Sequence, residues 1–315
     1  MRIAIVLTPL SDHHLRLASQ VGVTDVVSRY PGEEPDALLR LQDRVASFGM
    51  RLSIVEGYIP KELIVHGKPG RDDQIKNVQR LLREMGKASI PTCCYNWMPS
   101  DDWTRTSVAA PERGGALVTA FDADQDQGAM APAADRIDER SLWANLKYFL
   151  ERVLPVAEAA GVTMAMHPDD PPMSPFRGHG QIMSSVESFE RLIDLVPSPA
   201  NRLCFCQGTF AEMGVDIPAT IRRLGRFIHY GHFRDVVGTV PRFRETFHDN
   251  GKTDMAAAVR AYREVGFSGA MRPDHVPTLD GESNEHAGYA MLGRLFAVGY
   301  MRGLFHATAP AGVPR

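Results

Sequence analysis

The sequence predicts an α/β protein that folds as a (β/α)8 barrel, and three observations support this fold class. Eight short apolar runs alternate strictly with eight stretches that have helical spacing. Strict alternation is typical of a parallel sheet, and eight repeats match the strand number of a closed barrel. No G-x-G-x-x-G sequence follows the first apolar run, although an open dinucleotide-binding sheet would usually carry one there.

The predicted strands are short and rich in β-branched or small apolar residues, as expected for strands that are covered on both faces. The first of them reads RIAIVL. In chain order they cover residues 2–7, 23–27, 51–55, 90–94, 162–166, 202–206, 227–232 and 269–272.

The predicted helices show apolar residues at steps of three and four. In 72–87, Ile75, Val78 and Leu81 follow this spacing, and Asp72 is placed to cap the helix N-terminus. Glycine follows several of the helices, where a left-handed residue commonly ends a helix. The other predicted helices cover residues 11–20, 34–48, 139–160, 184–195, 216–225, 254–265 and 287–305.

One long segment, 97–137, interrupts the fourth strand–helix unit and shows no clear periodicity. A loop of roughly 40 residues inside a compact domain is usually functional or mobile. We therefore expect a single domain over residues 1–315, with 97–137 inserted after the fourth strand as a mobile lid over the barrel mouth.

The composition of the chain argues against several classes of binding partner. The formal net charge of −3 provides no basic field for nucleic acid or an anionic membrane, and no apolar run approaches the roughly 18–20 residues that span a bilayer.

The start of the chain turns polar too early for a signal peptide, and four cysteines make a poor disulfide framework for this length. We expect a cytoplasmic protein that binds a small molecule; homo-oligomer formation stays open.

Four consecutive predicted strands end on residues that can bind a metal ion. His167 follows the fifth strand, Cys206 ends the sixth, His232 ends the seventh, and Asp274 lies just beyond the eighth. Each alone would be read as a structural or turn residue, but barrel strands deliver their C-terminal ends to one rim. Thiolate and imidazole ligands disfavour Mg2+ and Ca2+ and favour Mn2+, Fe2+, Co2+, Ni2+ or Zn2+.

Other polar residues lie near the same strand ends. His275 and Tyr289 flank the metal set. Each alone would have an ordinary explanation, His275 as a loop histidine and Tyr289 as an aromatic residue at a helix start. The remaining candidates are expected to orient His167 or to contact substrate hydroxyl and carboxylate groups. These are Asn96, Arg105, Asp169, Arg234 and Arg272.

Four motifs, in chain order, resemble those of the D-mannonate dehydratase family: CYNWMPSDDWTRT at 94–106, MHPDDPP at 166–172, HFRDV at 232–236 and RPDH at 272–275. Two flanking stretches, at 67–90 and 288–304, are similar as well, so the resemblance covers most of the chain. It implies a xylose-isomerase-like barrel that binds Mn2+ or a related ion. Mn2+ or Fe2+ is preferred, with Co2+, Ni2+ and Zn2+ as alternatives. The family's metal ligands correspond to His167, Cys206, His232 and Asp274, and its proposed acid–base pair to His275 and Tyr289.

The implied activity is removal of water from a sugar acid such as D-mannonate to give 2-keto-3-deoxy-D-gluconate, a step of hexuronate breakdown. A cation would stabilise charge on the substrate carboxylate, while Tyr289 acts as base and His275 as acid, or the reverse.

Three alternatives remain. A sugar isomerase or epimerase on the same barrel would usually have a metal site richer in carboxylates, so Cys206 favours the dehydratase. A non-catalytic sugar-acid binding protein would not need both His275 and Tyr289. A phosphodiester hydrolase is disfavoured by the acidic net charge.

Overall fold

The computed structural model describes residues 1–100 and 103–309. Residues 101–102, within the expected lid segment, and 310–315, the end of the expected domain, lie outside the described part of the chain. Eight parallel strands form a closed barrel, in the spatial order β1-β12-β9-β8-β7-β4-β3-β2. The strands are β1 (Arg2–Val6), β2 (Asp25–Ser28), β3 (Arg51–Glu56), β4 (Thr92–Tyr95), β7 (Thr163–Met166), β8 (Asn201–Cys206), β9 (Ile228–Phe233) and β12 (Ala270–Pro273). The predicted (β/α)8 barrel is confirmed, and each predicted strand overlaps an observed one.

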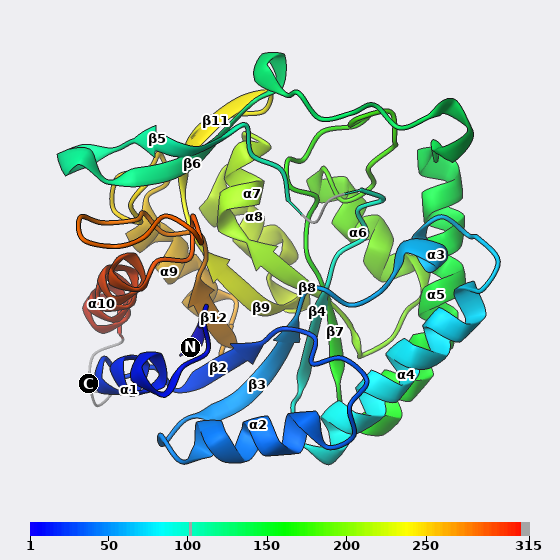
Figure 1. Cartoon of the computed structure of the whole chain (residues 1–315), viewed down its shortest axis with the longest axis horizontal. Helices are drawn as coiled ribbons and strands as arrows, with labels where there is room; N and C mark the ends of the chain where they lie inside the picture. The colour runs from blue at the N-terminus through cyan, green and yellow to red at the C-terminus, as the bar shows by residue number, and fades with distance from the viewer. Residues whose placement is uncertain (101–102, 310–315) are drawn as a thin grey trace.

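In the part of the chain that the structure describes, eight longer helices surround the barrel (Figure 1). They pack their apolar stripes against the outer strand faces, as the helical spacing predicted. These are α1 (Asp12–Gln20), α2 (Ala37–Ala46), α4 (Arg71–Lys87), α5 (Glu139–Ala160), α6 (Val186–Leu195), α8 (Ile217–Leu224), α9 (Met255–Glu264) and α10 (Met291–Ala307). Two short helices, α3 (Glu62–Val65) and α7 (Gln207–Glu212), add to this ring.

The predicted N-cap of α4 and the predicted position of Tyr289 at the start of the last helix are both wrong. Gly70 occupies the N-cap of α4 without a side-chain hydrogen bond. Asp72 lies inside the first turn and instead accepts a hydrogen bond from the Tyr148 hydroxyl at 2.7 Å. The eighth helix begins at Met291, so Tyr289 precedes it and belongs to the loop that follows β12.

The predicted irregular course of 97–137 is wrong for its middle part. Strands β5 (Ser107–Pro111) and β6 (Leu117–Asp122) pair with β10 (Val236–Thr239) and β11 (Arg242–Glu245) in an antiparallel sheet of order β10-β11-β6-β5. Sequence periodicity could not show this sheet, because its strands are short and two of them come from a distant part of the chain. We call it the rim sheet.

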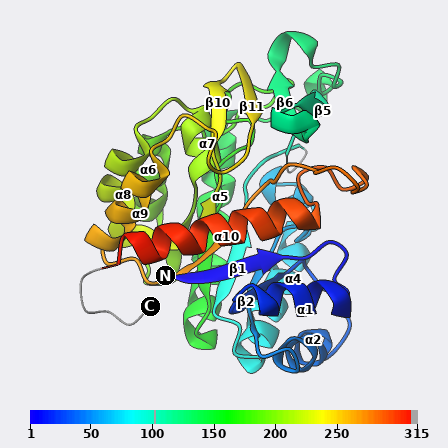
Figure 2. The same ribbon diagram turned by 90° about the vertical axis from the view of Figure 1, so that its left-hand side faces the viewer.

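The rim sheet stands beside the C-terminal end of the barrel, as the two perpendicular views show (Figure 2). Leu117 on β6 exchanges backbone hydrogen bonds with Thr278, at 3.0 and 2.8 Å, which fastens the sheet to the loop after β12. The rim sheet is therefore attached to the same loop that carries the predicted acid and base.

Within the described residues, no helix is both long and apolar enough to cross a membrane.

Candidate active site

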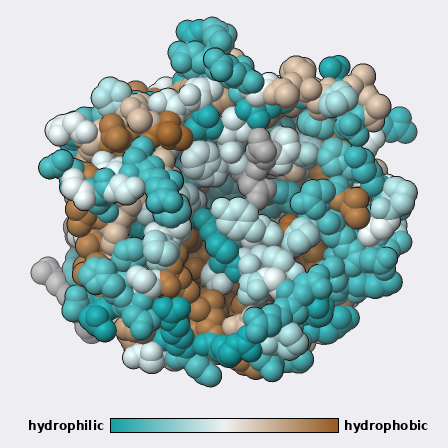
Figure 3. Space-filling view, viewed as in Figure 1, coloured by the Kyte–Doolittle hydropathy of each residue, from teal (hydrophilic) through white to brown (hydrophobic). Residues whose placement is uncertain are grey.

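A cavity of about 90 Å³ opens at the C-terminal ends of the barrel strands. In the space-filling view of this face, the centre is hollowed and hydrophilic residues predominate around it (Figure 3). Strand ends and the loops after them supply nearly all of its walls, which is the usual place of an active site in this fold. The lining side chains include Arg29, Glu56, Cys94, Tyr95, Asn96, Trp103, His167, Asp170, His232, Arg272, Asp274, His275 and Tyr289.

The four predicted metal ligands lie close together, and three of them, His167, His232 and Asp274, line this cavity. Ligand atoms of His167, Cys206 and His232 lie within 4.8 Å of one another. The Asp274 carboxylate is 3.4 Å from the Cys206 sulfur and 3.7 Å from Nδ1 of His232. Four neighbouring strands of the barrel thus bring three mutually close donors together and place the Asp274 carboxylate beside two of them.

Hydrogen bonds to the other ring nitrogens orient the two histidines. Nδ1 of His167 lies 2.7 Å from the carbonyl oxygen of Pro168, so Nε2 faces the other predicted ligands. Nε2 of His232 lies 3.2 Å from the Glu56 carboxylate. A histidine that donates one N–H to a carboxylate or carbonyl presents its second nitrogen to a metal, and such outer partners are usual in metal sites.

The charges around Cys206 favour its thiolate form. Burial alone would raise the pKa of this thiol, but Arg234 and hydrogen bonds from His167 and His232 hold the pKa well below its usual value. Burial likewise opposes ionisation of Asp274, but Arg272 and His275 keep its pKa well below the usual range. Both groups are therefore poised as anionic donors, and the donor set fits a divalent transition ion.

The predicted acid and base adjoin the metal donors. The ring centroids of His275 and Tyr289 lie 5.4 Å apart. Both residues line the cavity, His275 buried and Tyr289 partly buried. Burial would lower the pKa of His275, but Asp274 and Glu245 raise it to about 9. Burial would raise the pKa of Tyr289, but His275, Arg29 and Arg272 lower it to about 8.

The predicted substrate-binding residues divide into two groups. Asn96 and Arg272 line the cavity. Arg105, Asp169 and Arg234 do not line it. Asp169 accepts a hydrogen bond from the backbone N–H of Met183 at 2.7 Å.

Arg105 and Arg234 belong to a buried network of charges behind the cavity. Arg105 binds Asp170 at 2.6 Å and Glu245 at 2.5 Å. Arg234 contacts Glu245 at 2.7 Å, Glu212 at 2.9 Å and Asp274 at 3.0 Å. The network therefore joins the rim sheet, through Glu245, to the predicted metal ligands Asp274 and Cys206.

Residues 9–132 and 128–312 match the family described as D-mannonate dehydratase (UxuA). The mannonate dehydratase 2 of Halalkalibacterium halodurans is 32% identical over 303 residues, covering 87% of each chain. The chain belongs to the D-mannonate dehydratase family.

The family match confirms the resemblance that the sequence motifs indicated. The members of this family are hydro-lyases. A crystal structure of mannonate dehydratase from Streptococcus suis serotype 2 superimposes with a TM-score of 0.91 at 31% identity, covering 98% of this chain and 95% of that one. An L-ribulose 3-epimerase structure gives a TM-score of 0.64 at 14% identity, covering 99% of each chain, and shows a likeness of fold alone.

Sequence reasoning missed three residues of the site in this family member. Arg29 directly follows β2 and lines the cavity, so its position at a strand end could have identified it. The Trp103 ring lies 4.8 Å from the His275 ring, but it comes from a segment that was expected to be irregular. Glu245 lies on β11 of the rim sheet, which no sequence pattern predicted.

Proposed function

We propose that this chain is a metal-dependent hydro-lyase that converts a sugar acid such as D-mannonate to its 2-keto-3-deoxy product. The observation that supports this most is geometric: the His167, Cys206 and His232 donors and the Asp274 carboxylate lie beside Tyr289 and His275 at one cavity. The pKa of Tyr289 is lowered there and that of His275 is raised. A binding protein would need the donors but not this acid–base pair.

His167, Cys206, His232 and Asp274 would hold the ion, with Mn2+ or Fe2+ preferred and Co2+, Ni2+ or Zn2+ as alternatives. When bound, the ion supplies Lewis-acid stabilisation for negative charge that develops on the substrate carboxylate. Arg29 and Arg272 add positive charge to the cavity wall, and Asn96 offers an amide for a sugar hydroxyl.

Tyr289 and His275 would carry the protons. Tyr289, as phenolate, removes the proton from C2 of the sugar acid. His275, as imidazolium, protonates the C3 hydroxyl, which leaves as water together with its bonding electrons. The enol that results takes a proton at C3 and becomes the 2-keto-3-deoxy acid. Each proton transfer contributes roughly 10²–10⁴-fold to the rate.

Arg105, Asp169 and Arg234 have supporting roles in this proposal, because none of them lines the cavity. Asp169 stiffens the loop after β7, and the two arginines hold the rim sheet against the barrel. In this proposal the chain forms a single domain, and the segment 97–137 acts as its lid. The four cysteines are free and buried, which suits a reducing cytoplasm.

A panel of sugar acids tests the proposal. Metal-loaded protein is incubated with D-mannonate, other aldonic acids and uronic acids, and 2-keto-3-deoxy products are detected by a colorimetric assay for α-keto acids. We expect D-mannonate or a close stereoisomer to give the product only when the divalent ion is present. Absence of product with every acid, at full metal occupancy, would contradict the proposal.

A further inference from the structure

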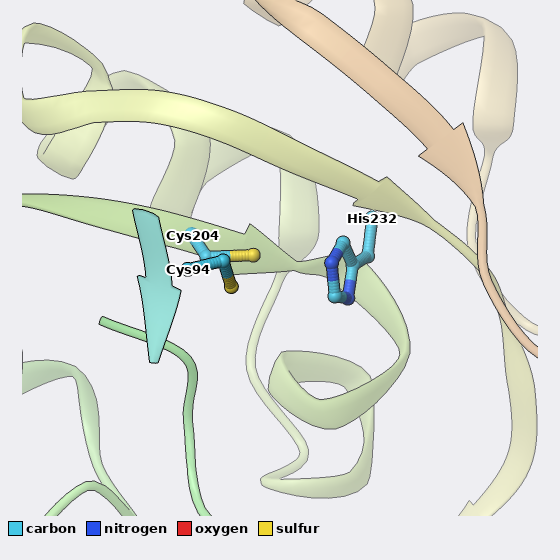
Figure 4. Close-up of side chains that lie close together, drawn as sticks. All are labelled: Cys94, Cys204 and His232. Atoms are coloured by element: carbon cyan, nitrogen blue, oxygen red, sulfur yellow. The ribbon is translucent and has the colours of Figure 1, made fainter. Parts of the chain in front are cut away.

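A second group of metal-type donors lies beside the first. Ligand atoms of Cys94, Cys204 and His232 come within 4.8 Å of one another, and all three residues are buried. The close-up shows the two cysteine side chains side by side and the His232 ring across from them, each carried by a different strand (Figure 4). The dehydratase chemistry proposed above uses His232 but neither of these cysteines.

The strand geometry explains why this group lies deeper than the first. Cys204 and Cys206 are two residues apart on β8, so both point into the barrel, one layer apart. Cys206 is opposite His232 on β9, whereas Cys204 is opposite Tyr230 in the layer below. Cys94 and Cys204 belong to the apolar cluster that fills the barrel interior. We call Cys94, Cys204 and His232 the inner cluster.

The donor chemistry of the inner cluster selects a thiophilic ion. Two cysteines and one histidine are a known protein ligand set for Zn2+, with a fourth position left for water. The two thiols lose their protons to solvent on binding, and the two thiolates then neutralise the charge of a divalent ion. A neutral complex can lie among apolar side chains, where an uncompensated charge could not.

The cavity gives such an ion a way in. Cys94 and His232 both line the cavity at the barrel mouth, while Cys204 lies behind them. An ion that reaches the proposed catalytic donors therefore also meets two of the three inner donors.

His232 cannot serve both groups at once. A neutral imidazole has one nitrogen that carries hydrogen and one that offers a lone pair. Whichever nitrogen binds an ion in the inner cluster, the ring can no longer ligate a second ion without losing its remaining proton.

We propose that Cys94, Cys204 and His232 form an inhibitory site for Zn2+ or a similarly thiophilic ion, which competes with the catalytic ion for His232. The inhibition rests on the proposed function, but ion binding to the inner cluster does not. The two claims can therefore be tested separately.

Cadmium tests the binding directly, because cadmium thiolates absorb in the ultraviolet. Protein loaded with Mn2+ is titrated with Cd2+, and the absorption is compared among Cys94→Ala, Cys204→Ala, Cys206→Ala and Cys93→Ala. Cys93 is the matched control, since it is equally buried on β4 but belongs to the cluster outside the barrel. We expect both inner-cluster variants to lose most of the absorption that survives in Cys206→Ala, while Cys93→Ala keeps it.

Serine variants at 94 and 204 provide a second pair that preserves side-chain size, and far-ultraviolet circular dichroism checks that each variant is folded. Cadmium absorption that follows Cys206 alone and is unchanged in folded Cys94 and Cys204 variants would overturn the proposal.

Zinc inhibition tests the consequence. Each variant is compared to its own uninhibited rate. The zinc concentration for half inhibition should rise at least about tenfold in Cys94→Ala and Cys204→Ala, because loss of even an outer partner of a metal ligand lowers metal affinity by about 10–100-fold. Cys93→Ala should match the parent protein, and added Mn2+ should relieve the inhibition. Equal zinc sensitivity in all variants would overturn the competition. If no sugar acid is turned over at all, the proposed function fails, while the cadmium result still decides whether the inner site exists.

Discussion

Glu245 on the rim sheet accepts a hydrogen bond from Nδ1 of His275 at 2.7 Å. Burial would raise the pKa of Glu245, but His275, Arg234 and Arg105 hold it below its usual value, so the carboxylate is the acceptor and the ring the donor. Through this bond, a residue of the rim sheet fixes the ring that we assign as the general acid. We therefore predict that the rim sheet takes part in positioning the general acid.

Glu245→Gln tests this positioning role. The amide keeps the size of the side chain but removes the charge that favours protonated His275. We expect kcat to fall at least about tenfold, because a misplaced or unprotonated acid loses its share of a 10²–10⁴-fold effect. KM for the sugar acid and metal content should change little. Glu112→Gln is the matched control, since Glu112 contacts Arg244 at 3.3 Å elsewhere on the rim sheet. If both variants lose activity equally, with thermal unfolding shifted alike, the role of Glu245 is structural only.

Tyr289→Phe and His275→Asn should each lower kcat by at least about a hundredfold, with metal content unchanged. Tyr289 acts as a base only when deprotonated, so the rate of the parent enzyme should rise with pH until about its pKa of 8. That rise should vanish in Tyr289→Phe. A variant that turns over substrate at near the parent rate, with the same rise, would show that another group is the base.

His167→Asn should lose metal first and activity as a consequence. The ring nitrogen that faces the other donors is removed, and three ligands hold a divalent ion less tightly than four. Metal content after dialysis, measured by elemental analysis, should fall well below that of the parent. His229→Asn is the control, because His229 also lies in the barrel wall but is hydrogen-bonded to Thr92, away from the mouth, at 3.0 Å. Full metal content in His167→Asn would remove this residue from the ligand set.

Limited proteolysis tests the lid. Arg113 lies in the turn between β5 and β6 and is partly exposed. We expect trypsin to cut there in free protein, and metal plus sugar acid to slow the cut, because ligand binding should order the segment. Cleavage confined to other loops, or at a rate that ligand does not change, would argue for a rigid rim.

The sequence was most informative where chemistry depends on strand order. His167, Cys206, His232 and Asp274 could be placed at one rim because strand ends follow from local periodicity, and barrel closure brings them together. Glu245 could not be found in this way. It meets Arg105, 140 residues away in the chain, only because two distant hairpins pair into the rim sheet.

The arginines show a second limit. Arg105 and Arg234 were expected to hold a carboxylate of the substrate, and they do bind carboxylates, but those of Asp170, Glu212 and Glu245. Residue type alone does not show whether an arginine binds a carboxylate of the substrate or a carboxylate side chain of the protein itself.

The most direct test of the central claim is isotope incorporation in D2O. D-mannonate is incubated with metal-loaded enzyme, the metal is removed, and the product is analysed by proton NMR and mass spectrometry. Dehydration predicts a 2-keto-3-deoxy acid that has lost the C2 proton and the C3 hydroxyl and carries one deuterium at C3. Recovery of a sugar acid that is deuterated at C2 but keeps all its hydroxyl groups, or of D-mannonate bound and unchanged, would contradict the claim.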